Sequence, residues 1–397
     1  MFKRIQNVDC FRKTVLVRAD LNVPMKNGII TDNTRLLSIK STLDFLKGQQ
    51  AKIVLISHFG RPEACSDPLF WDKKYTLSPL VQALNTLYDI PFSFAPKCVG
   101  EEVQKAIQSM DYGSALLLEN LRYYPGEEKN DEAFSKELAL GMDVYVNDAF
   151  SCSHRSHASI DQITRYIESC AGFSLQAELD ALQTLLEAPT RPLLAVVGGS
   201  KVSTKLDLLT NLCRKVDHIF IGGAMAHTFW VAMGYGIGKS VHEPNYVTTA
   251  SEILKHYGTK IHLPQDCMVA ESLENPEKIY SVSPHAIPAH MSVFDVGPHT
   301  VEVMGSFLQQ VKTVVWNGPV GAFEFPPFHE GSMSLARVVG ALTEKKILQS
   351  IAGGGDTLAA LEMAGVKDQF TYLSTAGGAF LEWLEGKKLP GVAALQV

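Results

Sequence analysis

The chain repeats one local pattern along its length: a short, almost wholly apolar strand, then a polar or glycine-rich turn, then a helix. In the first half we predict strands at 14–17, 53–56, 115–118 and 144–146, and in the second half the pattern lies within 193–206, 219–226, 313–324, 350–357 and 373–380. Apolar strands that alternate with helices predict a parallel sheet covered on both faces. We therefore expect an α/β protein with doubly wound parallel sheets.

The length requires more than one core, since single cores stop growing near about 250–300 residues and this chain has 397. Residues 173–188 are predicted to form one helix, because leucines recur at helical spacing and two prolines follow. The leucines are Leu175, Leu179, Leu182 and Leu186, and the prolines are Pro189 and Pro192. We predict domains at 1–172 and 189–380, joined by this linker helix, with the active site in the cleft between them.

The composition excludes several classes of protein. The formal net charge of −6 argues against a nucleic-acid partner. No apolar stretch is long enough to span a bilayer, and the first residues lack the apolar run of a signal peptide. Seven cysteines without a C-x-x-C pair are typical of reduced thiols. We expect a cytoplasmic protein that binds neither membrane nor nucleic acid.

Polar and cationic residues follow the predicted strands of the first half. Ligands of parallel sheets bind outside the carboxyl ends of the strands, so these residues are expected to converge. Arginine dominates, and its planar group suits bidentate binding of phosphate or carboxylate. The pattern favours a small, strongly anionic ligand over the alternative of unrelated surface arginines. The residues are Asp20, Asn22, Arg35, His58, Arg61, Arg122, His154 and Arg155.

In the second half, glycine pairs separate strands from helix starts. The stretch LLAVVGGSKVSTKL (193–206) predicts a strand, a turn, and a helix that Ser200 can cap. Free N–H groups at such a turn, with Lys201 and Lys205 beside it, indicate a phosphate site. The alternative is an ordinary strand–helix turn with surface lysines. In GGGDT (353–357), Asp356 beside phosphates would favour Mg²⁺, although it could also be a plain N-cap.

Three other patterns are rejected as sites. Gly238-Lys239-Ser240 resembles the end of a P-loop, but Met233 stands where that motif needs glycine, and a predicted helix (224–233) precedes it. The group Cys152, His154 and His157 lacks a second pair of ligands for zinc. The pair Phe229-Trp230 is expected in the core.

Seven motifs in order resemble the phosphoglycerate kinase family, and the resemblance covers essentially the full length. They are RADLNVP (18–24), SHFGRP (57–62), LLLENLR (116–122), NDAFSCSHRSH (147–157), VVGGSKVSTK (196–205), NGPVGAFE (317–324) and GGGDT (353–357). The resemblance implies a monomer that reversibly transfers a phosphoryl group between 1,3-bisphosphoglycerate with ADP and 3-phosphoglycerate with ATP. It also implies Mg²⁺ as cofactor and a C-terminal tail, 381–397, whose last residues, 389–397, return to the first domain.

The family's site residues carry over to matching positions of this chain. For the triose substrate the resemblance implies Asp20, Leu21, Asn22, Arg35, His58, Phe59, Gly60, Arg61, Arg122 and Arg155. For the nucleotide it implies Lys205, Asn317, Glu324 (on the ribose hydroxyls), Gly354, Gly355, Asp356 and Thr357, with Asp356 as the metal ligand. For the moving phosphoryl group it implies Arg35 and Lys201, with the backbone of Gly377 and Gly378.

Three motifs depart from the family pattern. Ala224 stands for a glycine where the backbone runs close to the adenine, and Ala376 stands for another glycine. Ser151, Ser156 and Ala158 also differ from the family around His154. None of these changes removes a charged group with an implied role.

The residue types suit a reaction that needs no general base, because a carboxylate or phosphate nucleophile is already ionised at neutral pH. Catalysis would then consist of positioning and charge stabilisation of an in-line transfer, completed when the domains close and exclude water. Two alternatives remain at this point. One is a carboxylate-activating ligase or another acid kinase, and the other is a catalytically silent binding protein on the same scaffold.

Overall fold

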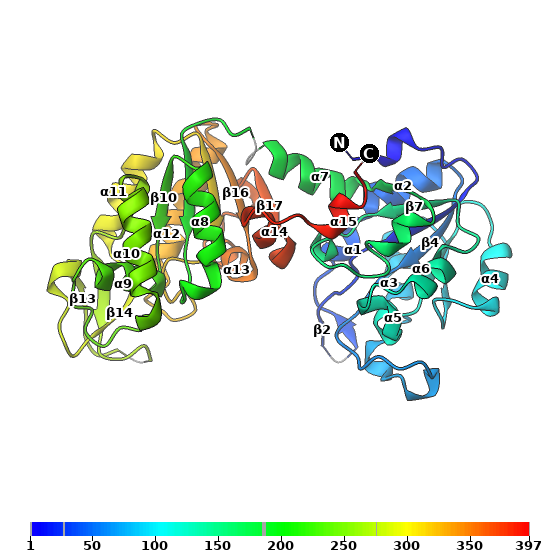
Figure 1. The fold of residues 1–397 in the computed structure, drawn as a ribbon, viewed down its shortest axis with the longest axis horizontal. Helices are drawn as coiled ribbons and strands as arrows, with labels where there is room; N and C mark the ends of the chain where they lie inside the picture. The colour runs from blue at the N-terminus through cyan, green and yellow to red at the C-terminus, as the bar shows by residue number, and fades with distance from the viewer. Residues whose placement is uncertain (1, 27, 185–187, 275, 397) are drawn as a thin grey trace. The chain divides into compact units, whose positions relative to one another are not determined.

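The computed structural model describes residues 2–26, 28–184, 188–274 and 276–396. The chain forms two compact units, Met1–Asp180 with Lys388–Val397, and Ala181–Lys387 (Figure 1). The predicted division into domains and a separate linker helix stays a prediction. The α-helix is shorter in the structure than the predicted range 173–188. It is α7, Phe173–Leu182, and the next two residues are in a wider π-helical turn. Leu186, predicted on its apolar face, lies outside the described residues.

The first unit is built on a six-stranded parallel sheet of order β5-β6-β4-β1-β7-β8. Its strands are β5 (Phe92–Ala95), β6 (Ala115–Leu118), β4 (Lys52–Ile56), β1 (Thr14–Arg18), β7 (Val144–Asn147) and β8 (Glu168–Ala171). The four central strands are the predicted ones, and they are almost wholly buried. The edge strands β5 and β8 each contain exposed and partly exposed positions, so they lack the continuous apolar run that identified the others.

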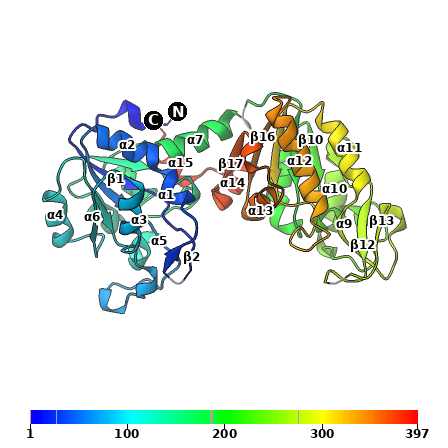
Figure 2. The same ribbon diagram turned by 180° about the vertical axis from the view of Figure 1, so that it is seen from behind.

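Helices cover both faces of this sheet. On one face Val15 and Val17 of β1 pack with α1 (Thr34–Ser38), α2 (Lys40–Gly48) and α3 (Leu80–Leu87). On the other face Leu16 packs with α4 (Glu101–Gln108) and α6 (Glu132–Ala139). Figure 2, the view from behind, shows α1, α2 and α3. The unit also contains α5 (Pro125–Glu128), α15 (Pro390–Ala393) and a small hairpin, β2 (Met25–Lys26) with β3 (Ile29–Ile30).

One predicted helix of this unit is interrupted. The sequence predicts a single helix with Leu36, Ile39, Leu43 and Leu46 inward, and all four are fully buried. The backbone of Ile39, at φ −85° and ψ 2°, instead separates α1 from α2. The sequence also predicts that Asn33 or Thr34 caps this helix; Asn33 is the N-cap of α1 but makes no side-chain cap hydrogen bond, and Asp32 Oδ1 instead accepts the backbone N–H of Thr34 at 2.7 Å.

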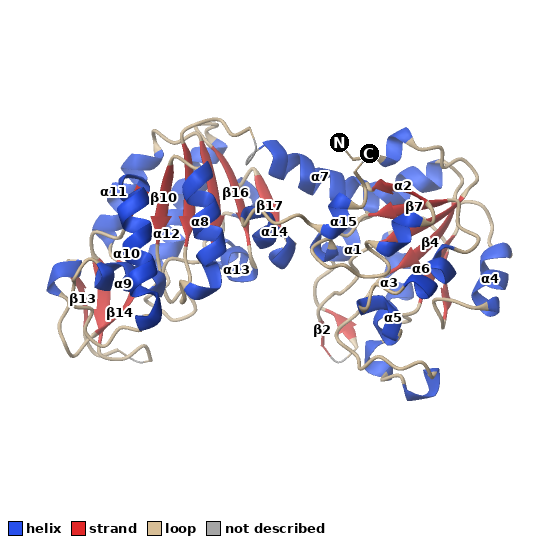
Figure 3. Ribbon diagram, viewed as in Figure 1, coloured by secondary structure: helices blue, strands red, loops and turns tan. Residues whose placement is uncertain are grey.

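The second unit has a parallel sheet of order β11-β10-β9-β15-β16-β17 (Figure 3). Its strands are β11 (Ile261–His262), β10 (His218–Ile221), β9 (Leu193–Val197), β15 (Thr313–Asn317), β16 (Gln349–Gly353) and β17 (Tyr372–Ser374). The flanking helices are α8 (Leu206–Lys215), α9 (Ala224–Ala232), α10 (Val247–Tyr257), α11 (Pro298–Leu308), α12 (Glu330–Glu344), α13 (Gly355–Met363) and α14 (Gly377–Leu384). The predicted α/β class with parallel sheets is confirmed.

A second, antiparallel sheet in this unit was not predicted. It has the order β13-β12-β14, with β12 (Cys267–Ala270), β13 (Ile279–Val282) and β14 (Ser292–Val296). Trp230 of α9 packs against its buried face together with Cys267, Val269 and Val293. This sheet matters for the site because β14 lines a cavity described below.

Candidate active site

The turns after β1, β4, β6 and β7 meet at the carboxyl edge of the first sheet, because adjacent parallel strands end together. Arg18 pairs in register with Ile56 and with Asn147. Asp20 and Asn22 follow Arg18 closely and His58 follows Ile56, whereas Arg155 lies eight residues after Asn147 and Arg35 lies in α1. The turns that carry the predicted polar residues therefore lie side by side at this edge, as the strand pattern predicts.

Asp20 and Asn22 form one polar group with Arg35. Arg35 Nη1 lies 3.2 Å from Asp20 Oδ2 and donates to the carbonyl of Asn22 at 2.7 Å. Asn22 Oδ1 accepts the backbone N–H of Gly60 at 2.9 Å, which ties the turn after β1 to the turn after β4. Ser151 Oγ donates to Asp20 Oδ2 at 2.5 Å. The guanidinium of Arg35 therefore has a fixed carboxylate partner and is only partly exposed.

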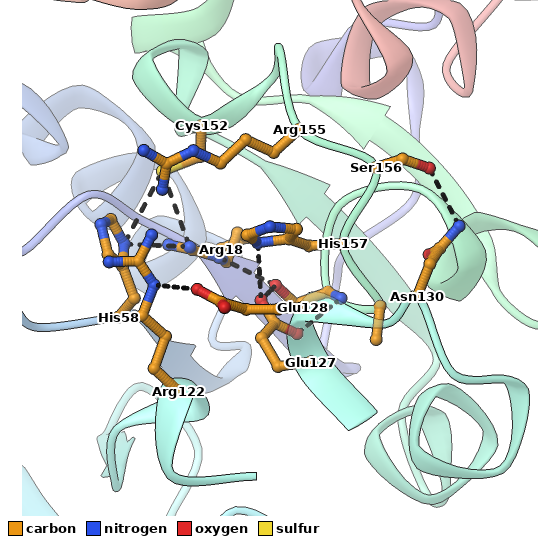
Figure 4. Close-up of polar contacts among 12 residues, drawn as sticks. Arg18, His58, Arg122, Glu127, Glu128, Asn130, Cys152, Arg155, Ser156 and His157 are labelled. Atoms are coloured by element: carbon orange, nitrogen blue, oxygen red, sulfur yellow. Dashed lines mark hydrogen bonds and ion pairs between the residues drawn. The ribbon is translucent and has the colours of Figure 1, made fainter. Parts of the chain in front are cut away.

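His58 contacts the guanidinium group of Arg18 and feels the charges of three further arginines. Arg18 Nη2 lies 3.1 Å from His58 Nδ1, and Figure 4 shows Arg18 between His58 and Glu127. Burial and the charges of four arginines hold the pKa of His58 well below its usual range. The arginines are Arg18, Arg122, Arg155 and Arg35. Because Arg18 always donates, Nδ1 must accept, and His58 is a neutral ring with its proton on Nε2.

The other predicted cations differ in setting. Arg122 is buried, donates to the carbonyl of Gly60, and lies with Nε 3.1 Å from Glu128 (Figure 4). Arg155 Nε donates to His154 Nε2 at 3.2 Å. Arg61 is exposed, with no hydrogen bond or ion pair to the described residues. The structure thus brings Arg35, Arg122 and Arg155 around His58 but leaves Arg61 outside this cluster.

Three of the expected triose residues have their backbone N–H groups already bound. Leu21 donates to Ser57 Oγ at 2.9 Å, Phe59 donates to Asn120 Oδ1 at 3.1 Å, and Gly60 donates to Asn22. Any contact these residues make with a ligand must use other atoms.

Arg18 is the residue that sequence reasoning missed here. It is 1% exposed, and its Nε donates to Ser159 Oγ at 3.1 Å. Glu127, fully buried, accepts from Ser159 Oγ at 2.6 Å and supplies the opposite charge. The signal was a charged residue ending the otherwise apolar strand TVLVR, where burial is unavoidable. Glu127 gave no such signal.

The second unit contains a cavity of about 570 Å³. Glycine turns after β9, β10 and β15 line it, together with β14 and residues of α9 and α13. Lys205, Glu324 and Asp356 are the predicted site residues on its wall. The predicted residues that do not line it are Lys201, Asn317, Gly354, Gly355, Thr357, Gly377 and Gly378.

Lys205 is held by oxygen atoms at the floor of the cavity. Its Nζ donates to the carbonyl of Gly198 at 2.7 Å and to Asn317 Oδ1 at 2.6 Å. Burial lowers the pKa of Lys205 to about 8, and the charge of Asp356 opposes this shift. Asn317 Nδ2 donates to Gly353 O at 2.8 Å, and Thr357 Oγ1 accepts from Gly318 N at 2.7 Å. Asn317 and Thr357 therefore join the turns that frame Lys205.

The turn after β9 differs from the prediction. The α-helix begins at Leu206, after a 3₁₀ turn at Ser203–Lys205, and Ser200 caps nothing. The carboxylate of Glu243 accepts from the backbone N–H of Ser203 at 2.9 Å and from its hydroxyl at 2.5 Å. The carboxylate of Glu243 therefore binds a backbone N–H group that we expected to be free for a phosphate.

Gly223 and Ala224 lie in the turn before α9, and Ala376 lies in the turn before α14. Gly223 has φ +66°, and a Cβ there would lie 2.7 Å from Gly199 O, so only glycine fits. Ala224 is the first residue of α9 and lies on the cavity wall. Ala376 is buried before α14 and does not line the cavity.

Asp356 is not a plain N-cap. It is the second residue of α13, whose cap position is Gly354 at φ +101°. Its side chain is exposed toward the cavity. Within the described residues no group of three or more His, Cys, Asp and Glu side chains could hold a metal ion.

The rejected P-loop pattern lies in a loop after α9, as predicted. Ser240 Oγ donates to Ile237 O at 2.6 Å and accepts from Val293 N at 2.9 Å, so it supports β14. Phe229 and Trp230 are buried, which confirms their predicted core position.

Two parallel α/β units, one with an arginine cluster and one with glycine turns around a lysine and an aspartate, define an enzyme that handles phosphorylated anions. The family model for phosphoglycerate kinase matches residues 5–387. The chain belongs to the phosphoglycerate kinase family. It is a kinase of glycolysis and gluconeogenesis with phosphoglycerate kinase activity.

Individual relatives match over the whole chain. The phosphoglycerate kinase of Chelativorans sp. (strain BNC1) is 47% identical, covering 100% of this chain and 99% of the relative. That of Rhodospirillum centenum is 48% identical, covering 99% of each. The structure of phosphoglycerate kinase from Coxiella burnetii matches with a TM-score of 0.90 and 40% identity, covering 100% of this chain and 99% of that one.

A more distant structure has the same fold. The phosphoglycerate kinase of Pyrococcus horikoshii OT3 is 29% identical, with a TM-score of 0.82, and covers 100% of this chain and 98% of that one. No helix among the described residues has the length and apolar character needed to cross a membrane.

Proposed function

We propose that the arginine cluster binds 3-phosphoglycerate or 1,3-bisphosphoglycerate and that the cavity of the second unit binds ADP or ATP. One observation carries the assignment of the triose. The charges of four guanidinium groups act on the neutral ring of His58, and such a concentration of positive charge is stabilised by a ligand with several negative charges.

For the triose we propose direct contacts from the predicted residues at the carboxyl edge of the first sheet. Arg122 and Arg155 bind its charged groups, and His58 donates a hydrogen bond from Nε2. Asp20 and Asn22 hold Arg35, and they accept from the ligand's hydroxyl. Arg61 is free to turn toward the ligand, because it is exposed. Leu21, Phe59 and Gly60 complete the wall.

For the nucleotide we propose that Lys205 binds the phosphates and Glu324 binds the ribose hydroxyls. Both residues lie on one cavity wall. The N–H groups of Gly354, Gly355 and Thr357 begin α13, where a helix N-terminus favours an anion. Asn317 positions Lys205 through the 2.6 Å hydrogen bond to Nζ.

The residues present fit a magnesium ion held mostly by the nucleotide. Asp356 offers one exposed carboxylate beside the lysine that we assign to the phosphates. Mg²⁺ commonly takes one or two protein carboxylates and completes its shell with water and phosphate oxygens. When bound, the ion neutralises charge on the phosphates. We propose Asp356 as its ligand in this chain.

The chemical step needs positioning and charge rather than a base, since both nucleophiles are ionised at neutral pH. We propose that Arg35 and Lys201 stabilise the phosphoryl group in an in-line transfer, with the backbone N–H groups of Gly377 and Gly378. Lys201 is exposed and free of the hydrogen bonds that hold Lys205. We also propose a monomer in the cytoplasm, where glycolysis and the seven free thiols belong.

Steady-state turnover with Mg-ATP tests this assignment of substrates. The acyl phosphate is trapped with hydroxylamine, and glycerate and acetate replace 3-phosphoglycerate as controls. We expect product with 3-phosphoglycerate alone. Product with acetate alone would indicate a different acid kinase, and nucleotide binding without any product would indicate a binding protein.

A further inference from the structure

Ser151 is a hydroxyl side chain that lies against Asp20 in the first unit. It belongs to the 3₁₀ turn Phe150–Cys152, which follows β7. Its Oγ donates a hydrogen bond to Asp20 Oδ2 at 2.5 Å. The contacts proposed above for the triose include Asp20 but give Ser151 no role.

The backbone of this turn fixes where the hydroxyl lies. Cys152 N donates to the carbonyl of Ala149 at 3.1 Å, and Ser153 N donates to the carbonyl of Phe150 at 2.9 Å. Ser151 lies inside both of these closed turns, so its Cα cannot shift without breaking them. Rotation about the Cα–Cβ bond is the movement that takes the hydroxyl away from Asp20.

The donors around the carboxylate of Asp20 fill its acceptor positions. A carboxylate accepts about four hydrogen bonds, two at each oxygen. Oδ1 accepts from Asn22 N at 3.1 Å and from Arg35 Nη1 at 3.3 Å. Oδ2 accepts from Ser151 Oγ and lies 3.2 Å from Arg35 Nη1. A ligand hydroxyl that donates to Asp20 must therefore displace one of these donors.

Ser151 is the donor whose displacement costs least. Asn22 N is a backbone group in the turn after β1, and Arg35 is charged and is also held by the carbonyl of Asn22 at 2.7 Å. The hydroxyl of Ser151 is neutral and turns about a single bond. The residue is partly exposed, so water can accept and donate hydrogen bonds to the hydroxyl once it has turned away.

We propose that Ser151 occupies, in the free protein, the acceptor position on Asp20 Oδ2 that the triose hydroxyl takes on binding, and that this exchange weakens the discrimination against ligands without that hydroxyl. The inference rests on the proposed triose site. One hydroxyl replaces another on the same carboxylate oxygen, so the hydrogen bonds to Asp20 do not increase in number. Ser151 acts on the ligand through Asp20 and is therefore a positioning residue.

Loss of the Ser151 hydroxyl should reveal the full contribution of the ligand's hydroxyl. In Ser151→Ala, Oδ2 depends on water while the site is empty, and the Asp20 side chain is only 13% exposed. A deoxy ligand would cover this oxygen without offering a donor, and a buried charged acceptor left without a donor is costly. The hydroxy ligand would supply the missing donor. The two ligands should therefore separate in affinity.

Calorimetric titration of two ligands into the full chain tests the proposal. One is 3-phosphoglycerate, and the other is its 2-deoxy analogue, which lacks only the hydroxyl. We expect the ratio of their affinities to be at least about fivefold larger in Ser151→Ala than in the unaltered protein. Ser151→Cys should give a similar increase, because a thiol has nearly the size of the hydroxyl but is a weak donor.

The matched control is Ser156→Ala. Ser156 belongs to the same segment and also donates to a carboxylate, but its partner is Asp161 Oδ2 at 2.6 Å. Figure 4 shows Ser156 on the side of Asn130, away from His58 and Arg122. Its ratio of affinities should equal that of the unaltered protein.

Two results overturn the inference alone. One is a ratio that stays within about twofold of the unaltered protein in both Ser151 variants. The other is a ratio that falls because 3-phosphoglycerate binds more weakly, as a direct contact between Ser151 and the ligand's hydroxyl would give. If 3-phosphoglycerate did not bind the unaltered protein, the proposed triose site itself would be contradicted instead.

Discussion

At the scale of single residues, charge is controlled by burial more than by residue type. His58 and Lys205 both have shifted pKa values, and burial is the largest cause in each case. The shifts act in the same direction, toward the neutral form, in sites that we assign to anions. Arginine stays charged, so the charge of the triose site does not change with pH. The charge of Lys205 in the nucleotide site does change, because its pKa is about 8.

We predict that His58 stays neutral at neutral pH, because its pKa lies well below the usual range of histidine. The neighbouring guanidinium groups and burial disfavour its charged form. ¹H–¹⁵N NMR of the histidine rings measures this directly, with the signal assigned by its loss in His58→Gln. A titration midpoint near 6.5 would contradict the neutral Nε2–H ring.

We predict that affinity for Mg-ATP falls as pH rises from 7 to 9. The pKa of Lys205 is about 8 without ligand, so the free protein loses this charge above that pH. Phosphates favour the charged form, so binding should take up a proton near pH 8. Calorimetry in buffers of different ionisation enthalpy measures that uptake. Lys205→Arg is the control and should show no uptake, because its side chain stays charged.

At the scale of elements, carboxylates distant in sequence decide where helices begin. Asp148 Oδ1 accepts the backbone N–H groups of Ser174 at 2.8 Å and Leu175 at 3.1 Å, which caps α7. Its other oxygen, Oδ2, is buried without a hydrogen-bond partner, and burial raises the pKa of Asp148 to about 6. Burial therefore disfavours the ionised form of this capping carboxylate.

We predict that Asp148 lowers stability as pH rises from about 4 to 6. The folded protein holds this proton more tightly than the unfolded chain, so the stabilisation present below pH 4 is lost through pH 6. The shift from 3.8 to about 6 corresponds to about 3 kcal/mol. Asp148→Asn should lack this pH dependence in urea unfolding. Parallel pH profiles for the two proteins would disprove the assignment.

The strand pattern predicted the central strands because each of them is mainly apolar and buried. It missed β5, β8 and β11, since edge strands expose part of their length, and it missed the antiparallel sheet that completes the cavity. The helix start at Leu206 depends on Glu243, about forty residues later in the chain. No local pattern contains such a contact.

Sequence reasoning placed residues near one another best where a charged residue follows a strand. Arg122, Arg155 and His58 lie in one region for that reason, whereas Arg35 reaches it from α1. Arg18 was not assigned a role because it lies inside the strand, and Glu127 was not because nothing local indicates burial.

At the scale of the whole molecule, the two substrates are assigned to different compact units. Direct transfer requires the donor phosphate and the acceptor oxygen at bonding distance. We predict that 3-phosphoglycerate with a non-hydrolysable Mg-ATP analogue lowers the radius of gyration in small-angle scattering. Each ligand alone should have less effect. An unchanged radius with both ligands bound would argue against closure.

The most direct test of this account is calorimetric titration of each ligand into Arg122→Met and Lys205→Met. The account predicts a crossed pattern. Arg122→Met should weaken 3-phosphoglycerate at least about tenfold and leave Mg-ATP unchanged, and Lys205→Met should do the reverse, since each removes a charged hydrogen bond from one site. If either variant weakened both ligands equally, or only the ligand assigned to the other unit, the division of the site would be contradicted.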